Sequence, residues 1–229
     1  MDDFVSIWDH TYTLLDGKVS VLVHEDLDAG LGGTLFDGSV ALSGYLEGLL
    51  RDEPEYFTGK DVLELGAGCG FPGLFVGKVG GKVVLTDLGP VVELLQENIE
   101  LNKLEANTKA MSLNWLSDED LRAITPHKFD YILAADTIYA EDAVEPFLNV
   151  CWELSSPSTQ ILFAHPRARV PAASERFWRM VRDRFSVEKV PASRFVKDWT
   201  PSCKQFLSET QGVFILRRRG DLPESVATQ

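Results

Sequence analysis

The stretch that most constrains the fold runs from Asp61 to Gly73 and reads DVLELGAGCGFPG. Its first part, Val62 to Leu65, is a short apolar run typical of a buried strand, and a second apolar run, Leu74 to Val79, follows the glycines at once. Closely spaced glycines allow backbone conformations that a Cβ forbids, and they let a ligand lie against bare peptide groups. We therefore predict a strand, a tight turn and a helix, with a nucleotide-like cofactor bound at the turn.

Two cofactor classes fit this turn. The pattern G-x-G-x-x-G, which starts at Gly68, is typical of dinucleotide sites, whereas an earlier register starts at Glu64 and continues through Gly66, Gly68 and Gly70. Glu64 places a carboxylate inside an apolar strand, where an unpaired charge is costly. A pyrophosphate would repel that charge, and the ammonium of a methionine group would pair with it directly or through water. The sequence thus favours S-adenosylmethionine over NAD. In the alternative interpretation, Glu64 binds only amides of the loop.

The length and composition predict one α/β domain. With 229 residues and 45% hydrophobic content, the chain can bury a full core, and no Pro/Ser/Gly-rich linker divides it. We expect residues 1–30 to form an N-terminal extension, 31–220 the core and 221–229 a tail.

The net charge of −13 argues against a grip on nucleic-acid phosphates. The one tight basic run, Arg217 to Arg219, is interpreted as a solvated strand end. An acidic surface instead attracts cationic partners, such as a protein segment that carries lysine.

The three cysteines are odd in number and lack the close pairing of a zinc or redox motif, which indicates reduced thiols. The first residues are acidic where a secretory signal is basic, and no apolar run reaches the length of a membrane span. The four histidines show no metal-ligand spacing, so no metal site is predicted. We expect a monomer in the cytoplasm or nucleus that contacts no membrane.

Strands and helices are predicted to alternate along the chain. The predicted strands cover residues 11–15, 19–24, 62–65, 82–87, 108–113, 129–134, 160–164, 185–190 and 212–216. The predicted helices cover 40–50, 74–79, 91–101, 143–154 and 174–184, with Asp37 or Ser39 as the first cap and Ser174 as the last. This alternation predicts a mostly parallel sheet covered on both faces. The last strand should be antiparallel, because too little chain separates 190 from 212 for a helical crossover.

The first two strands form a predicted hairpin around Asp16-Gly17. It precedes the main sheet and is plausible as a docking lip for a folded protein.

Two polar or aromatic residues follow neighbouring strands of the predicted sheet. Asp87 ends its strand, and its acceptor-only carboxylate would bind both hydroxyls of a ribose; the alternative role is a cap for the helix that starts near Pro90. Trp115 would stack on adenine or, alternatively, fill the core. In parallel sheets ligands bind outside the carboxyl ends of strands, where both residues are expected.

The sequence Asp136-Thr-Ile-Tyr139 follows the fourth strand of the core, opposite the glycine loop. Asp136 would orient an incoming amine, whose proton is accepted by the carboxylate or by water, and the ring of Tyr139 would hold the alkyl part. The alternative is a helix cap with Tyr139 packed beneath it.

Five segments together resemble the seven-stranded protein-lysine methyltransferases of the methyltransferase-like 21 family. They are residues 35–42, 62–70, 84–88, 113–115 and 134–139, and their order and spacing are kept from about residue 32 to 185. The Asp-x-x-Tyr after the fourth strand is more specific than the glycine loop. The resemblance implies a single Rossmann-like domain of seven strands.

The resemblance also implies the reaction. S-adenosylmethionine would donate a methyl group to a lysine of a target protein, leaving S-adenosylhomocysteine, and the target would be a chaperone, an elongation factor or an AAA-type ATPase. Asp136 and Tyr139 would lie at the substrate lysine. The implied cofactor contacts are Phe36, Glu64, Gly66, Ala67, Gly68, Gly70, Asp87, Leu88, Trp115 and Ala135. Phe36 stands where the family usually has Trp, so an aromatic face remains without the indole N–H.

Three other functions stay open from the sequence. One is a methyltransferase for a small molecule or another protein side chain, the second is a non-catalytic module that binds S-adenosylmethionine, and the third is a dehydrogenase.

Overall fold

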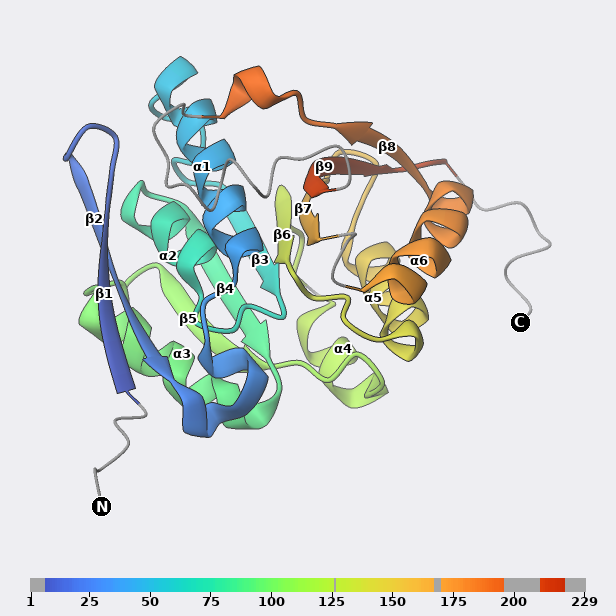
Figure 1. Cartoon of the computed structure of the whole chain (residues 1–229), viewed down its shortest axis with the longest axis horizontal. Coiled ribbons are helices and arrows are strands. Elements are labelled where there is room, and N and C mark those ends of the chain that lie inside the picture. The colour runs from blue at the N-terminus through green and yellow to red at the C-terminus, as the bar shows by residue number, and fades with distance from the viewer. Residues whose placement is uncertain (1–6, 126, 167–169, 196–210, 221–229) are drawn as a thin grey trace.

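A seven-stranded sheet forms the centre of the protein in the computed structural model, which describes residues 7–125, 127–166, 170–195 and 211–220. The predicted tail, 221–229, and Cys203 lie outside these ranges. The strands follow one another across the sheet in the order β5-β4-β3-β6-β7-β9-β8 (Figure 1). Their bounds are β3 Asp61–Leu65, β4 Lys82–Asp87, β5 Thr108–Ser112, β6 Tyr131–Ala135, β7 Gln160–Pro166, β8 Phe185–Lys189 and β9 Gln211–Arg218.

The first five strands of this order run parallel to one another, and β9 is antiparallel to both of its neighbours, β7 and β8. The predicted α/β sheet with an antiparallel last strand is therefore confirmed.

Helices cover both faces of the sheet, as predicted (Figure 1). Side chains of β3 alternate between the two cores: Val62 faces the first core, and Leu63 and Leu65 face the second. Glu64 therefore points to the same face as Val62. That first core is formed with α1 Asp37–Asp52, α2 Phe71–Lys78 and α3 Gly89–Leu101, and the second with α4 Asp118–Ile124, α5 Val144–Leu154 and α6 Pro171–Arg184.

The structure corrects two predicted helix caps. Helix α1 begins at Asp37 behind Phe36, so neither Asp37 nor Ser39 is its N-cap. Helix α6 begins at Pro171, three residues before the predicted cap, because proline is well suited to a first helical turn. Ser174 lies inside the helix, where its hydroxyl is 2.7 Å from Nε2 of His165.

Helix α4 was not predicted. It is short and polar, and Ser117 caps it by accepting the N–H of Asp120 at 3.2 Å. The pattern Ser-x-x-Asp is an N-terminal signal that the sequence offered.

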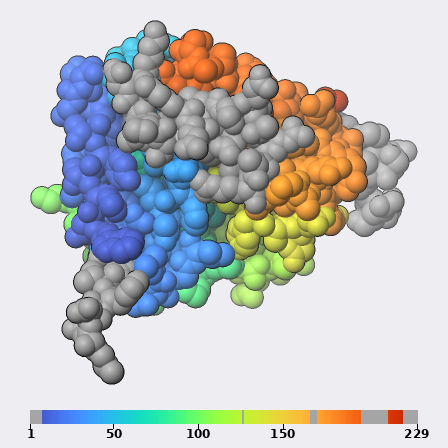
Figure 2. All heavy atoms as spheres, viewed as in Figure 1, coloured from blue at the N-terminus to red at the C-terminus, as the bar shows by residue number. Residues whose placement is uncertain are grey.

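The predicted N-terminal hairpin is confirmed: β1 Ile7–Leu14 pairs antiparallel with β2 Val19–Asp26 and forms a sheet of its own. It lies along one side of the molecule, outside the main sheet (Figures 1 and 2). Side chains of the core hold it through its backbone, since Glu47 of α1 accepts the N–H of Leu15 at 2.7 Å. A short helix, η1 Leu27–Gly33, leads from the hairpin to α1.

None of the helices in the described ranges is long and apolar enough to cross a membrane.

Candidate functional site

The strand order changes direction between β3 and β6, because the chain adds β4 and β5 on one side of β3 and then returns to the other side with β6. Ligands of such sheets bind outside the carboxyl ends of the strands at this point. Two turns meet there: the glycine loop, residues 66–70, after β3, and the Asp136–Tyr139 turn after β6. The methyl group of Thr137 lies 2.8 Å from the position that a Cβ on Gly66 would take, so the two turns are in direct contact.

Three glycines of the loop have left-handed backbone angles, with φ of 58° at Gly66, 54° at Gly68 and 79° at Gly70. A Cβ would raise the energy of each conformation. At Gly68 it would also lie 3.1 Å from the carbonyl oxygen of Gly32 in η1. The bond from the N–H of Gly70 to the carbonyl of Ala67, at 2.8 Å, closes the turn.

Glu64 is buried beneath this loop and faces α2. Its Oε2 accepts the N–H of Gly73, in the first turn of α2, at 2.8 Å. A Cβ on Gly73 would lie only 2.5 Å from that oxygen, so the last glycine of the motif allows the close approach. Burial raises the pKa of Glu64 to about 8, against the opposing effect of the Gly73 N–H. In the alternative interpretation Glu64 binds backbone amides, and the bond from Gly73 is a contact of that kind. The pairing of Glu64 with the ammonium of the cofactor stays a prediction.

Asp87 lies at the carboxyl end of β4 and holds the loop from the side. Its Oδ2 accepts the N–H of Gly68 at 2.8 Å, and its Oδ1 accepts the N–H of Leu88 at 2.7 Å. Burial raises the pKa of the Asp87 carboxyl. Each carboxylate oxygen has a second lone pair, so these bonds leave acceptors for two hydroxyl groups. The side chain of Leu88 is 49% exposed beside it.

Trp115 follows β5 and lies next to the glycine loop, with Cζ2 3.6 Å from the position that a Cβ on Gly66 would take. Its ring packs edge-on against Phe147 of α5, at 5.5 Å between centroids. Asp120 of α4 accepts the N–H of Asn114 at 2.8 Å and so fixes the segment that carries the tryptophan. Trp115 is half-buried, which is compatible with both the adenine and the core role.

Asp136 begins the second turn, directly after buried Ala135 at the end of β6. Its φ of 55° is left-handed, which aspartate tolerates better than most residues. Its Oδ2 accepts the N–H of Gly38 at the start of α1, at 2.7 Å. Tyr139, three residues on, is 60% exposed. Asp136 therefore does cap a helix, one far away in the sequence, but Tyr139 is not packed beneath it.

Sequence reasoning missed Gly38 and Thr137. A Cβ on Gly38 would lie 2.4 Å from Oδ2 of Asp136, so only glycine lets α1 approach the carboxylate. The sole sequence signal was the glycine next to the predicted helix cap. Thr137 is buried in the second turn, and its methyl group lies against Gly66.

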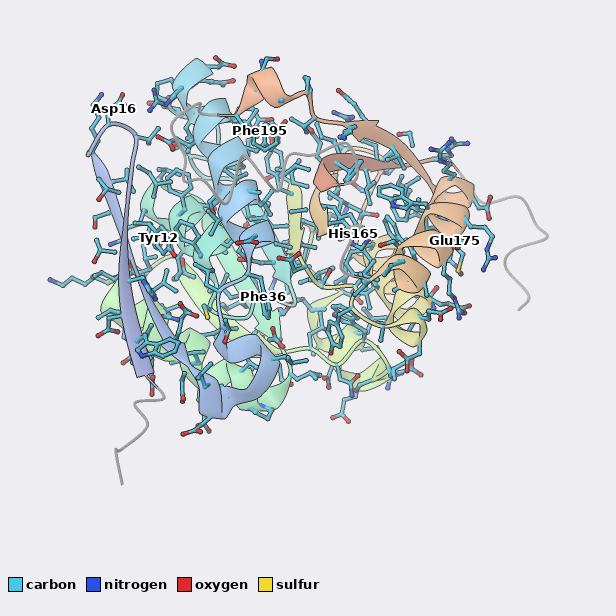
Figure 3. The ribbon with its side chains drawn as sticks, viewed as in Figure 1. Tyr12, Asp16, Phe36, His165, Glu175 and Phe195 are labelled. Carbon is cyan, nitrogen blue, oxygen red and sulfur yellow. The ribbon has the colours of Figure 1, made fainter. Side chains whose placement is uncertain are left out.

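Phe36 lies between η1 and α1, with its ring 36% exposed (Figure 3). Cys69, in the glycine loop, is buried, and its thiol donates to the carbonyl of Gly32 at 3.6 Å. Burial raises the pKa of this thiol to about 12, so it stays protonated and unreactive at neutral pH.

These residues form a set that fits S-adenosylmethionine. The glycine loop is a cradle that Cβ atoms would fill, Asp87 keeps acceptors for ribose hydroxyls, and Leu88 and Trp115 offer apolar surface for a base. In the described part of the chain, no group of three His, Cys, Asp or Glu side chains is arranged to hold a metal ion.

Structural comparison finds the same fold in solved methyltransferases. The T. thermophilus 16S rRNA N2 G1207 methyltransferase, solved with AdoMet and guanosine, gives a TM-score of 0.61 at 20% identity, over 93% of this chain and 51% of that one. An O-methyltransferase from Bacillus cereus in complex with SAH gives 0.50 at 20% identity, over 76% and 79% of the two chains. At this identity the likeness concerns the fold alone.

Sequence comparison identifies the family. A family model described as lysine methyltransferase matches residues 16–184. Protein N-lysine methyltransferase METTL21A of Danio rerio is 34% identical over 162 residues, which are 70% of this chain and 72% of the relative. EEF1A lysine methyltransferase 3 of Xenopus tropicalis is 27% identical over 184 residues, 80% and 79% of the two chains. The predicted resemblance is confirmed: the chain belongs to the lysine methyltransferase family.

Proposed function

We propose that this lysine methyltransferase transfers a methyl group from S-adenosylmethionine to the ε-amine of a lysine on a folded protein, with Asp136 and Tyr139 at the lysine. The observation that carries the assignment is the position of Asp136. Asp136 lies at the end of β6, next to the glycine loop, and its carboxylate accepts the N–H of Gly38. A fixed acceptor beside the cofactor loop is what an incoming amine requires.

The cofactor supplies an electrophilic methyl group, which the amine nitrogen takes as the C–S bond breaks and the bonding pair stays on sulfur. The protein contributes mainly alignment and an uncharged nucleophile. Asp136 accepts a hydrogen bond from the amine and receives its proton, directly or through water. Tyr139 is exposed beside it and lines the path of the lysine stem.

The cofactor would be held by the loop peptides and by four side chains. Glu64 would pair with the ammonium of the methionine group, Asp87 would bind the ribose hydroxyls, and Trp115 and Leu88 would enclose the base. Phe36 and Ala135 complete the predicted contacts.

The target is proposed to be a protein whose lysine lies in a basic environment. Exposed acidic residues follow two of the site residues in the chain, with Asp118 and Glu119 after Trp115 and Glu141 and Asp142 after Tyr139. Together with the net charge of −13 they attract a cationic segment. Chaperones, elongation factors and AAA-type ATPases are the candidates, and elongation factor 1A comes first because one relative is named for it.

We also propose that the protein is a monomer that binds no nucleic acid and works in the cytoplasm or nucleus. The basic run lies at the end of β9 and is partly paired: Arg217 pairs with Glu188 at 3.1 Å, and Arg218 lies 3.7 Å over the ring of Trp152. Cys69 and Cys151 are free thiols.

Labelling of a cell lysate tests the proposal. The protein and methyl-labelled S-adenosylmethionine are expected to label a protein band, and sequencing of that band identifies the lysine. Label confined to metabolites would refute a protein target and favour the small-molecule alternative. No labelled product of any kind would favour the non-catalytic module.

A further inference from the structure

Asn98 lies on the buried face of α3, and its side chain joins two separate parts of the chain. Oδ1 accepts the N–H of His24 in β2 at 2.7 Å. Nδ2 donates to the carbonyl of the same His24 at 3.0 Å and to the carbonyl of Cys69 at 3.1 Å. Cys69 lies in the middle of the glycine loop. One fully buried amide therefore binds the N-terminal hairpin on one side and the cofactor loop on the other.

Asn102, one turn further along α3, binds the hairpin in the same way. Its Oδ1 accepts the N–H of Leu22 at 3.0 Å, and its Nδ2 donates to the carbonyl of Leu22. The second bond of this Nδ2 goes to the carbonyl of Asn98, within α3 itself, at 2.8 Å. Among the hydrogen bonds of the described residues, the link to the glycine loop thus belongs to Asn98 and not to Asn102.

The spacing explains how one helix can hold a strand edge. Residues two apart in a strand turn their N–H and C=O groups to the same side, and residues four apart in a helix lie on the same face. His24 and Leu22 are paired in this way with Asn98 and Asn102. Each side-chain amide turns one acceptor and one donor toward β2, as a peptide group of a neighbouring strand would, and keeps a second N–H for another partner.

The hairpin and the segment behind it also contact the loop region directly. The ring of Tyr12, from β1, lies 4.3 Å from the ring of Phe71 at the start of α2 (Figure 3). The carbonyl of Gly32, in η1, faces both Gly68 and the thiol of Cys69. The described part of this N-terminal region, residues 7–33, therefore borders the glycine loop.

We propose that Asn98 is a positioning residue for the cofactor: it fixes the Cys69 carbonyl against β2, so the shape of the glycine loop depends on the seated hairpin. A loop with several left-handed glycines has much conformational freedom to lose. Fixing it before the cofactor arrives removes that ordering cost from binding. The hairpin is then part of the cofactor site, whatever it contributes to the target protein. The inference rests on the cofactor of the proposed function and not on the identity of the acceptor.

A matched pair of variants tests it. Asn98→Ala and Asn102→Ala both remove the amide that holds β2, but only the first removes the bond to Cys69. In calorimetric titrations with S-adenosylhomocysteine, we expect about tenfold weaker binding for Asn98→Ala, the size of one lost buried hydrogen bond. The affinity of Asn102→Ala should stay within about threefold of that of the wild type. This smaller change is what a loosened hairpin alone would cause.

Hydrogen exchange of the free proteins gives a second readout. Amides of residues 66–70 should exchange faster in Asn98→Ala than in Asn102→Ala, at equal stability of the rest of the protein. Equal weakening of cofactor binding in the two variants, or unchanged binding by folded Asn98→Ala, would overturn the proposal.

A second pair acts from the hairpin, in case Asn98→Ala does not fold. His24→Pro and Leu22→Pro each remove one N–H on the edge of β2 that faces α3, and neither N–H is used in the pairing with β1. His24→Pro should weaken binding more than Leu22→Pro, and the reverse order contradicts the proposal. A wild type that does not bind S-adenosylhomocysteine refutes the cofactor assignment and the inference with it, whereas binding without lysate labelling refutes only the protein target.

Discussion

The two turns at the carboxyl edge of the sheet solve opposite problems. The glycine loop after β3 presents peptide groups, and its three left-handed glycines keep side chains out of the way. The turn after β6 presents side chains: Asp136 is held from α1, and Tyr139 projects from the surface. Both turns use left-handed backbone, but only the second needs it in a residue with a Cβ.

This contrast separates binding from chemistry. Peptide groups suit a cofactor, because any sequence with enough glycine provides them. An acceptor amine needs a defined charge at a defined place, which only a side chain offers. Substitutions in the two turns should therefore have different consequences for cofactor affinity and for turnover.

The largest effect is expected for Asp136→Asn. Asparagine tolerates left-handed backbone and its Oδ1 still accepts the N–H of Gly38, so the fold should persist. The charge and the proton acceptor are lost, and turnover should fall about 100- to 10,000-fold. Affinity for S-adenosylhomocysteine should change less than about threefold. Initial rates on the labelled target and calorimetry measure the two. A rate near that of the wild type would reduce Asp136 to a helix cap.

Gly66→Ala should show the opposite pattern, with its main effect on cofactor affinity. The added Cβ is strained by φ of 58° and lies 2.8 Å from Thr137, so cofactor binding should weaken about 100-fold. Gly59→Ala is the control, since Gly59 has φ of 71° and open space around it. It carries the same backbone strain away from the site and should lower Tm without changing affinity. Equal affinity in Gly66→Ala and the wild type would contradict the role of the loop.

The substitution Glu64→Gln should have an intermediate effect, a change in stability that depends on pH. The pKa of Glu64 in the folded protein is raised from 4.5 to about 8, so its contribution to stability is present below pH 4.5 and is lost as the pH rises through 8. The wild type should therefore lose stability relative to Glu64→Gln between pH 5 and 8, on the order of 2–4 kcal/mol. Urea unfolding at several pH values measures the difference, and parallel pH profiles would refute it.

Cofactor binding should also release a proton from Glu64. If the ammonium of the cofactor ionises Glu64, binding at pH 7 releases close to one proton, and Glu64→Gln abolishes this part. Calorimetry in buffers of different ionisation enthalpy measures the release. Identical proton release by both proteins would leave Glu64 as a partner of Gly73 alone.

The smallest effect is expected at Tyr139. Because this side chain is exposed, Tyr139→Ala should leave Tm unchanged and raise KM for the target about two- to fivefold, the size of an exposed cation–π contact. Tyr139→Phe keeps the ring face and should resemble the wild type. A loss of turnover in Tyr139→Phe would instead assign a role to the hydroxyl.

Much of this architecture could be predicted from local patterns. Apolar runs such as 62–65 and 82–87 identified the strands, and the short connection after residue 190 identified the antiparallel strand. Helix α4 escaped because Asp118–Ile124 is mostly polar and ends after two turns. Its cap at Ser117 was the better signal.

The contacts that hold the site residues in place could not be predicted from local sequence patterns. Asp136 was identified by its place after a strand, but its partner Gly38 is 98 positions away and becomes a neighbour only in the folded chain. Asn98 falls within the predicted helix 91–101, next to apolar residues. Its three hydrogen bonds depend on where β2 and the glycine loop come to lie, which no local pattern encodes.

The borders of the sheets have a consequence for solubility. Strands β5 and β8 lie at the two sides of the main sheet, and in the hairpin β1 is the strand turned away from α3. Each carries exposed charged or polar side chains: Lys109 on β5, Glu188 and Lys189 on β8, and Asp9 and His10 on β1. Charges on an open strand disfavour its pairing with the strand of another molecule. The described borders are therefore protected against edge-to-edge aggregation at the concentrations that accumulate during synthesis.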